Sequence, residues 1–123
     1  MFSFSFQRRW QSTNNSTSPS PTLPVKTYFN AKADKAQILS DNKNKSGIYM
    51  FQNLTNGKQY IGSSNNLTKR FYEYFNQNSL LRNKSMAICC ALLKHGHSNF
   101  AITILEYCSP DKCLIRENII GIY

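Results

Sequence analysis

The chain has 123 residues and carries 15 Lys and Arg against 6 Asp and Glu, a formal net charge of +9 at pH 7. This length suits one domain, and no stretch approaches the roughly 18 apolar residues of a membrane-spanning helix, so we expect no membrane partner. The positive charge favours a nucleic-acid partner, because Lys and Arg displace counterions from phosphates; the alternative is a role in solubility or import.

Residues 1–24 are predicted to be a mitochondrial transit peptide and linker. Arg8 and Arg9 stand among bulky apolar and hydroxyl residues, and no acidic residue precedes Asp34. This composition is typical of mitochondrial import, whereas a secretory signal requires an uninterrupted apolar core. Pro, Ser and Thr crowd residues 16–24, which offer little apolar surface to offset the entropy of ordering. We expect a mitochondrial location and a disordered N-terminal segment; the alternative is an extension with no targeting role.

Residues 25–45 are predicted to be a polar linker. The stretch 31–39 is compatible with a short helix, for which Asn30 supplies a cap. The remaining residues, 46–123, form the expected folded domain. A domain of that size is marginal, because small domains bury a smaller share of their surface.

Residues 47–52 and 58–63 are predicted to form a β-hairpin. Both contain β-branched and aromatic residues, and Asn56-Gly57 between them tolerates the positive φ of a tight turn. A hairpin places Tyr49 and Tyr60 on neighbouring strands, and the glycine in each strand leaves backbone room for a ligand. The alternative is an ordinary half-buried hairpin in which the two tyrosines pack as a cross-strand pair.

Two helices and a strand are predicted next along the chain. Asn66 can cap a helix over residues 67–76, where the apolar positions follow helical spacing. A second helix over residues 84–95 should end at Gly96. Residues 100–107 show a partial alternation of apolar and polar residues, which predicts a third strand.

A last helix is predicted from Pro110 onward, since proline suits the first helical turn. The side chains of the second helix expected to face inward are Met86, Ala87, Cys90 and Leu93. The order β-β-α-α-β-α predicts an α+β domain with a small three-stranded antiparallel sheet flanked by helices.

The triplets Gly47-Ile48-Tyr49 and Tyr60-Ile61-Gly62 resemble the two signature motifs of the GIY-YIG nuclease family. Further segments resemble the family's later landmarks in the same order, namely residues 62–70, 94–96, 104–106 and 114–118. The resemblance covers residues 46–123 and points to the nuclease domains of fungal mitochondrial intron-encoded homing endonucleases. It implies a GIY-YIG-like domain that is truncated at its C-terminus, because the chain ends six residues after Glu117.

This resemblance implies a metal-dependent endonuclease of homing-endonuclease type that hydrolyses phosphodiester bonds in double-stranded DNA. Carried over by position, the catalytic residues are Tyr49, Tyr60 and Arg70, and Glu117 holds one divalent ion, Mg²⁺ or Mn²⁺. The residue types suit these roles, because carboxylate oxygen binds hard cations and guanidinium can bind two phosphate oxygens. A phenol has a pKa of about 10, but adjacent cations favour the phenolate. No other small-molecule cofactor is expected.

Three further residues are expected to bind nucleic acid. Lys58 precedes Tyr60 by two positions on the predicted strand, where it can contact phosphate or lower the pKa of a tyrosine. Lys69 lies next to Arg70 in the motif. Asn83 stands where many relatives carry a histidine, and an amide binds phosphate or water but cannot shuttle a proton. Tyr74 also stands at a position where homing relatives often carry histidine.

Each candidate has an alternative role. Arg70 can pair with Glu73 on its own helix, a contact worth a few tenths of a kcal/mol, and Glu117 can be a solvent-facing helix residue. The whole chain can then be a catalytically impaired nucleic-acid-binding remnant, or a truncated product that does not fold.

Overall fold

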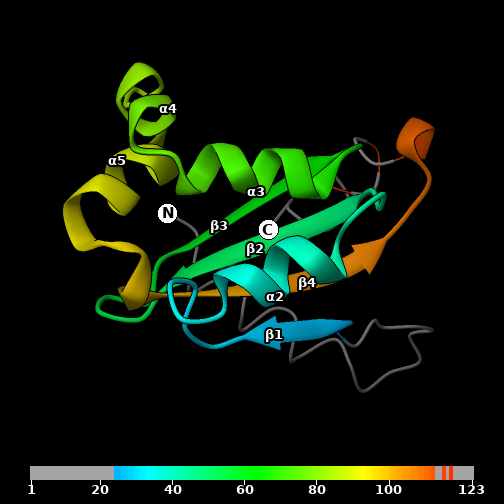
Figure 1. The fold of residues 1–123 in the computed structure, drawn as a ribbon, viewed down its shortest axis with the longest axis horizontal. Coiled ribbons are helices and arrows are strands. Elements are labelled where there is room, and N and C mark those ends of the chain that lie inside the picture. Colours follow the sequence, from blue (N-terminus) through cyan, green and yellow to red (C-terminus); the bar gives the residue numbers. More distant parts are fainter. Residues whose placement is uncertain (1–23, 113–114, 116, 118–123) are drawn as a thin grey trace.

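The computed structural model describes residues 24–112 together with residues 115 and 117. They form one antiparallel sheet in the strand order β1-β4-β2-β3, with helices packed on it (Figure 1). The α+β class predicted from the sequence is therefore confirmed. The strands are β1 (Lys26–Tyr28), β2 (Gly47–Asn53), β3 (Gln59–Ser64) and β4 (Phe100–Tyr107).

The sheet has four strands, so the prediction of three strands was wrong. The additional strand, β1, pairs with β4 so that Tyr28 lies opposite Ile102. Tyr28 is buried, with 3% of its surface exposed. The strand is too short for a period-two pattern to be recognised in the sequence. Residues 1–23 of the predicted transit peptide lie outside the described residues.

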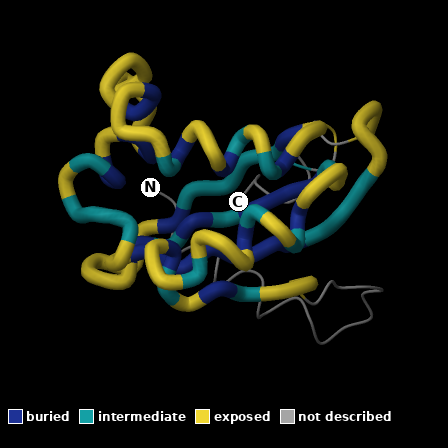
Figure 2. Tube along the Cα trace, in the orientation of Figure 1, coloured by how far each residue is buried: buried dark blue, intermediate teal, exposed yellow. Residues whose placement is uncertain are grey.

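Two helices, α2 (Lys35–Asp41) and α3 (Leu67–Phe75), lie side by side across one face of the sheet (Figure 1). The buried residues gather on the strands and on the helix sides that face them (Figure 2). As predicted, Asn66 caps α3, because its side-chain oxygen accepts a hydrogen bond from the backbone N–H of Lys69 at 3.1 Å. In the described part of the chain, no helix is long and apolar enough to cross a membrane.

The helix expected over residues 84–95 is α5 (Ala87–His95), which begins three residues later and ends, as predicted, at Gly96, with a φ of +82°. A further short helix, α4 (Gln77–Arg82), precedes it and was not predicted. The 3-10 turns η1 (His97–Asn99) and η2 (Pro110–Lys112) flank β4. The last predicted helix is described only at residues 115 and 117, and both are helical.

The predicted inward face of α5 was also wrong. Its buried side chains are those of Ile88, Cys89, Ala91 and Leu92. Met86 precedes the helix and is 44% exposed, and Cys90 is exposed as well. Almost every residue of this stretch is apolar, so hydrophobicity alone does not fix which side of the helix is buried.

Aromatic rings fill the space between the sheet and α3. Tyr49 and Phe51 of β2 meet Phe71 and Tyr74 of α3 in edge-to-face contacts, with ring centroids 5.4 Å apart for Tyr49–Phe71 and 5.0 Å apart for Phe51–Tyr74. Such contacts add about 0.5–1.5 kcal/mol each beyond the area that they bury. They hold α3 in a fixed position over the hairpin.

A glycine on β3 makes this packing possible. Tyr49 lies directly opposite Gly62 in the antiparallel register. A Cβ atom on Gly62 would lie 2.5 Å from the phenol oxygen of Tyr49 and 2.7 Å from Cζ. The expected space for a ligand at this glycine is therefore occupied by the Tyr49 ring. On the other side of β2, a Cβ atom on Gly47 would collide with the carbonyl oxygen of Glu106.

Gly62→Ala should destabilise the fold by about 1–3 kcal/mol, because the Tyr49 ring or the backbone of β3 must move to admit the methyl group. Urea unfolding of the purified chain would measure the change. In a Tyr49→Ala background the same substitution should cost clearly less, since no ring then overlies position 62. Equal costs in both backgrounds would show that this contact does not constrain the glycine.

Candidate active site

One cleft brings together the four residues that were expected to form the active site. Tyr49, Tyr60, Arg70 and Glu117 all line a cleft of about 230 Å³. They come from β2, β3, α3 and the helical residues near the end of the described chain. The sequence separates Tyr49 from Glu117 by most of the domain, so the fold creates this grouping.

Tyr49 is buried and held by two neighbours. Only 3% of its surface is exposed, and its hydroxyl lies 2.9 Å from the hydroxyl of Tyr74. Arg70 donates to the same oxygen from Nη1 over a longer distance, 3.5 Å. Burial raises the pKa of Tyr49 well above its ordinary value, the neighbouring Tyr74 raises it further, and Arg70 offsets only part of this effect.

The expectation that adjacent cations favour the phenolate therefore does not hold for Tyr49 in this structure. Desolvation outweighs the charge of Arg70, so the Tyr49 phenol stays protonated at neutral pH. Its hydroxyl is fixed in direction by Tyr74 and Arg70. At rest, Tyr49 is a positioned hydrogen-bonding group.

Tyr60 forms a different part of the wall. It lies opposite Phe51 in the register, whereas Tyr49 lies opposite Gly62, so the two tyrosines do not form a directly opposed cross-strand pair. Tyr60 is half-buried, and burial raises its pKa, with a further contribution from nearby Cys90. This phenol is also protonated at neutral pH.

Arg70 contacts both Tyr49 and an acidic neighbour. Its Nε lies 3.5 Å from Oε1 of Glu73, so the pairing considered as the alternative is present in the structure. Both side chains are partly exposed, and such a pair contributes at most about 1 kcal/mol. Burial acts to lower the pKa of Arg70, but the phenols of Tyr49 and Tyr74 raise it overall. The guanidinium remains charged and is only weakly held by Glu73.

Glu117 is half-buried and oriented by Ser63. The hydroxyl of Ser63 on β3 donates a hydrogen bond of 2.6 Å to Oε1 of Glu117. Among the described residues there is no group of three or more His, Cys, Asp and Glu side chains that could hold a metal ion. A single carboxylate suits Mg²⁺, which usually keeps several waters and shares its coordination with substrate phosphates. It does not suit zinc, which requires several nitrogen or sulfur ligands.

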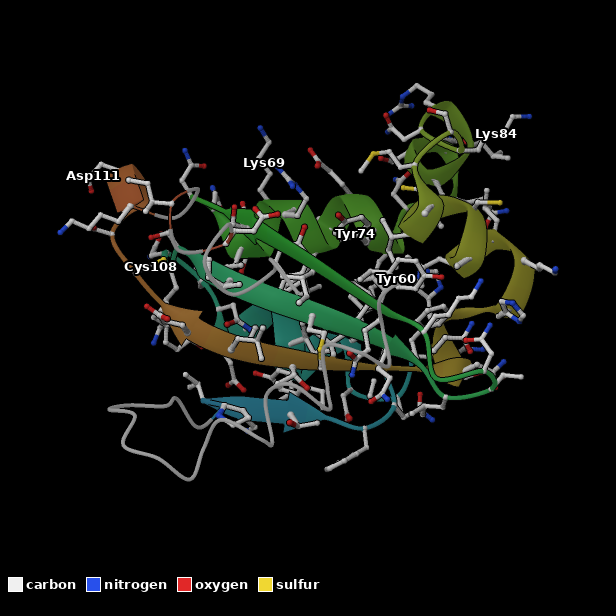
Figure 3. The ribbon with its side chains drawn as sticks, turned by 180° about the vertical axis from the view of Figure 1, so that it is seen from behind. Tyr60, Lys69, Tyr74, Lys84, Cys108 and Asp111 are labelled. Carbon is white, nitrogen blue, oxygen red and sulfur yellow. The ribbon has the colours of Figure 1, made fainter. Side chains whose placement is uncertain are left out.

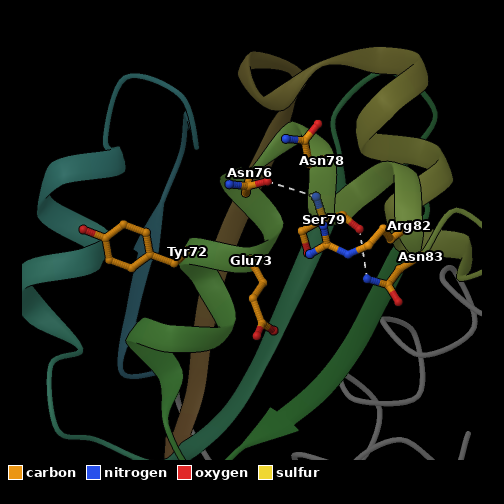
Figure 4. Close-up of a pocket in the computed structure, with 7 residues that line it drawn as sticks. All are labelled: Tyr72, Glu73, Asn76, Asn78, Ser79, Arg82 and Asn83. Carbon is orange, nitrogen blue, oxygen red and sulfur yellow. Dashed lines mark hydrogen bonds between the residues drawn. The ribbon is translucent and has the colours of Figure 1, made fainter.

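The three residues expected to contact nucleic acid lie outside this cleft. Lys58 is exposed just before β3, and Lys69 projects from α3 away from the sheet, whereas Tyr74 points from the same helix toward the cleft (Figure 3). Asn83 lines a separate cavity of about 420 Å³ beside α3 and α4 (Figure 4).

Two residues of the cleft were not predicted to have a role there. Tyr74 was identified only as a departure from the family's histidine, although its position four residues after Arg70 puts both on one helix face. Ser63 was part of the hairpin motif, but its contact with Glu117 spans 54 positions and has no local signal.

Comparisons with known proteins identify relatives of this chain. The model of the GIY-YIG catalytic domain matches residues 45–120. Probable intron-encoded endonuclease 1 of Neurospora crassa is 35% identical over 114 residues, which cover 89% of this chain and 36% of that protein. Intron-associated endonuclease 1 of Enterobacteria phage T4 is 37% identical over 76 residues, which cover 60% of this chain and 31% of that protein. The chain thus spans about a third of the length of these curated relatives.

Among solved structures, the catalytic domain of homing endonuclease I-TevI is similar to this chain. The two are 33% identical, with a TM-score of 0.49, and the match covers 61% of this chain and 83% of that chain.

The stability of the fold should fall as the pH rises above about 10. The folded state raises the pKa of Tyr49, so it retains a proton that the unfolded state releases near pH 10. The contribution of Tyr49 to the free energy of unfolding is fully present below about pH 10. Above that pH it is lost, by up to about 1.4 kcal/mol per pH unit. Urea unfolding at about pH 8 and about pH 11 would measure the loss, which Tyr49→Phe should reduce. An equal loss in both proteins would show that Tyr49 does not contribute.

Proposed function

Because the chain belongs to the GIY-YIG family, we propose that it is an endonuclease domain of homing-endonuclease type that hydrolyses phosphodiester bonds in double-stranded DNA. The observation that carries the proposal is the convergence of Tyr49, Tyr60, Arg70 and Glu117 on one cleft. The names of the relatives, which describe intron-encoded and intron-associated endonucleases, agree with it.

A divalent ion is part of this proposal. When bound at Glu117, Mg²⁺ or Mn²⁺ supplies charge neutralisation at the phosphate and a more acidic water. The chain's contribution is to orient the carboxylate, because the hydroxyl of Ser63 fixes one of its oxygens. Hydrogen bonds of this kind typically tune metal affinity.

The other residues of the cleft bind and position the substrate. Arg70 can exchange its weak pairing with Glu73 for two bonds to phosphate oxygens. The neutral Tyr49 hydroxyl, which Tyr74 and Arg70 hold in place, can orient a water or a phosphate oxygen. Tyr60 lines the same cleft from β3. In this proposal, Arg70 and the ion stabilise the negative charge that develops on the phosphate, and the phenols orient the reacting groups.

Contacts with the DNA outside the cleft are assigned to three further residues. Lys58 and Lys69 are exposed cations, and Asn83 offers an amide on the side of α4. The net charge of +9 supports attraction to a polyanion. We place this activity in mitochondria, on the composition of residues 1–24. The proposed nuclease residues lie within 46–123, and β1 and α2 pack onto the same sheet and helix layer.

A second candidate is a nucleic-acid-binding remnant with impaired catalysis. The raised pKa of Tyr49 favours it, as does the phenol of Tyr74 in place of a histidine that could exchange protons near neutral pH. Binding without cleavage would distinguish this candidate from the nuclease.

The purified chain should nick supercoiled plasmid in the presence of Mg²⁺ or Mn²⁺. Glu117→Gln and Arg70→Ala should each reduce the rate by roughly 100-fold or more, because each removes charge stabilisation at the phosphate. Asp111→Asn is a matched control, since Asp111 is an exposed carboxylate on η2 that does not line the cleft (Figure 3). Cleavage by Glu117→Gln at the unaltered rate would refute the assignment, and binding without any cleavage would favour the remnant.

Ser63→Ala should raise the metal concentration needed for half-maximal cleavage by roughly 10- to 100-fold, because the Glu117 carboxylate loses its orienting donor. Titration of Mg²⁺ at fixed DNA concentration would measure the shift. The rate at saturating metal should largely recover. A defect that persists at saturation, in a protein with an unchanged thermal transition, would show that Ser63 acts on another step.

A further inference from the structure

A second cavity adjoins the cleft and is lined mainly by hydrogen-bonding side chains. It measures about 420 Å³ and lies beside α3 and α4 (Figure 4). Its amides and its cation belong to Asn76, Asn78, Arg82 and Asn83. We call it the amide pocket.

Two amides of the pocket are held rigidly by the ends of α4. The side-chain oxygen of Asn76 accepts from the backbone N–H of Ser79 at 2.9 Å, and Nδ2 of Asn83 donates to the carbonyl of Ser79 at 2.9 Å. Each bond uses one end of an amide. The opposite ends, a donor on Asn76 and an acceptor on Asn83, are then held in direction by these bonds, and Arg82 lines the same pocket (Figure 4).

This combination fits the edge of a nucleobase better than a phosphate. Arg and Asn side chains are among those that read base edges in DNA through hydrogen bonds. Glu73 also lines the pocket, and its carboxylate disfavours a phosphate there. A ligand with both donors and acceptors matches the lining.

The pocket and the cleft share a wall. Glu73 lines the pocket, Arg70 lines the cleft, and the two side chains are paired at 3.5 Å. A nucleic acid with one phosphate at Arg70 therefore has nucleotides close to the amide pocket. We propose that the amide pocket is a base-reading subsite, which recognises nucleotides flanking the cleaved bond through Asn76, Arg82 and Asn83. This inference rests on the proposed function, since it requires a nucleic-acid substrate.

Arg82→Gln tests the subsite, with Lys84→Gln as its matched control. Both positions are exposed and each variant removes one positive charge. Only Arg82 lines the pocket (Figure 4), whereas Lys84 does not line it. The full chain would be mixed with a pool of random-sequence DNA duplexes without divalent metal, and bound and unbound duplexes would be sequenced. Arg82→Gln should reduce the ratio of affinities between the most and the least preferred sequences by roughly 5-fold or more. Lys84→Gln should weaken all sequences by a similar factor.

Asn78→Ala provides a second variant, because Asn78 lines the pocket without taking part in the bonds to Ser79. It should also alter sequence preference with an unchanged thermal transition. An Arg82→Gln protein that behaves as Lys84→Gln does would overturn the subsite, and so would an unaltered chain with no sequence preference. Failure of the unaltered chain to bind any duplex at low salt would instead overturn the proposed function.

Discussion

The cleft depends on one steric fit, the Tyr49 ring lying over Gly62. Because Gly62 has no side chain, the phenol crosses from β2 over β3 and meets Tyr74 and Arg70 on α3. The same ring packs against Phe71 and so fixes α3 over the hairpin. One contact therefore sets both the position of a helix and the direction of a hydroxyl group in the candidate site.

This fit also sets the chemical character of the site. A ring that is buried well enough to hold α3 in place is desolvated, and desolvation keeps its hydroxyl protonated. Tyr49 therefore contributes a hydroxyl group of fixed direction and does not act as a base at neutral pH. The charged groups of the site, Arg70 and Glu117, are only partly buried. Arg70 can leave its weak ion pair for a ligand, and Glu117 has, among the described residues, a single hydrogen bond, from Ser63, which leaves it able to bind one. Rigid phenols thus lie beside accessible charged groups.

Features with local chemistry were predictable from the sequence. Asn66 and Gly96 mark helix ends through their own side-chain or backbone properties, and the hairpin follows from Asn56-Gly57. Features that depend on distant partners were not. The strand β1 has only three residues, and its Thr27 meets Thr103, 76 positions away. The role of Ser63 likewise appears only when β3 and the helical residue Glu117 are brought together.

The short strand β1 has a further consequence, for the solubility of the fold. It covers the outer side of β4, whose backbone groups would otherwise be unpaired along part of their length. The family match begins at residue 45 and omits this strand. A chain shortened to that match would expose an open sheet edge, which is a template for pairing with another copy. Residues 26–28 contribute no group to the cleft, but as a three-residue edge strand they replace the longer open edge that β4 would present.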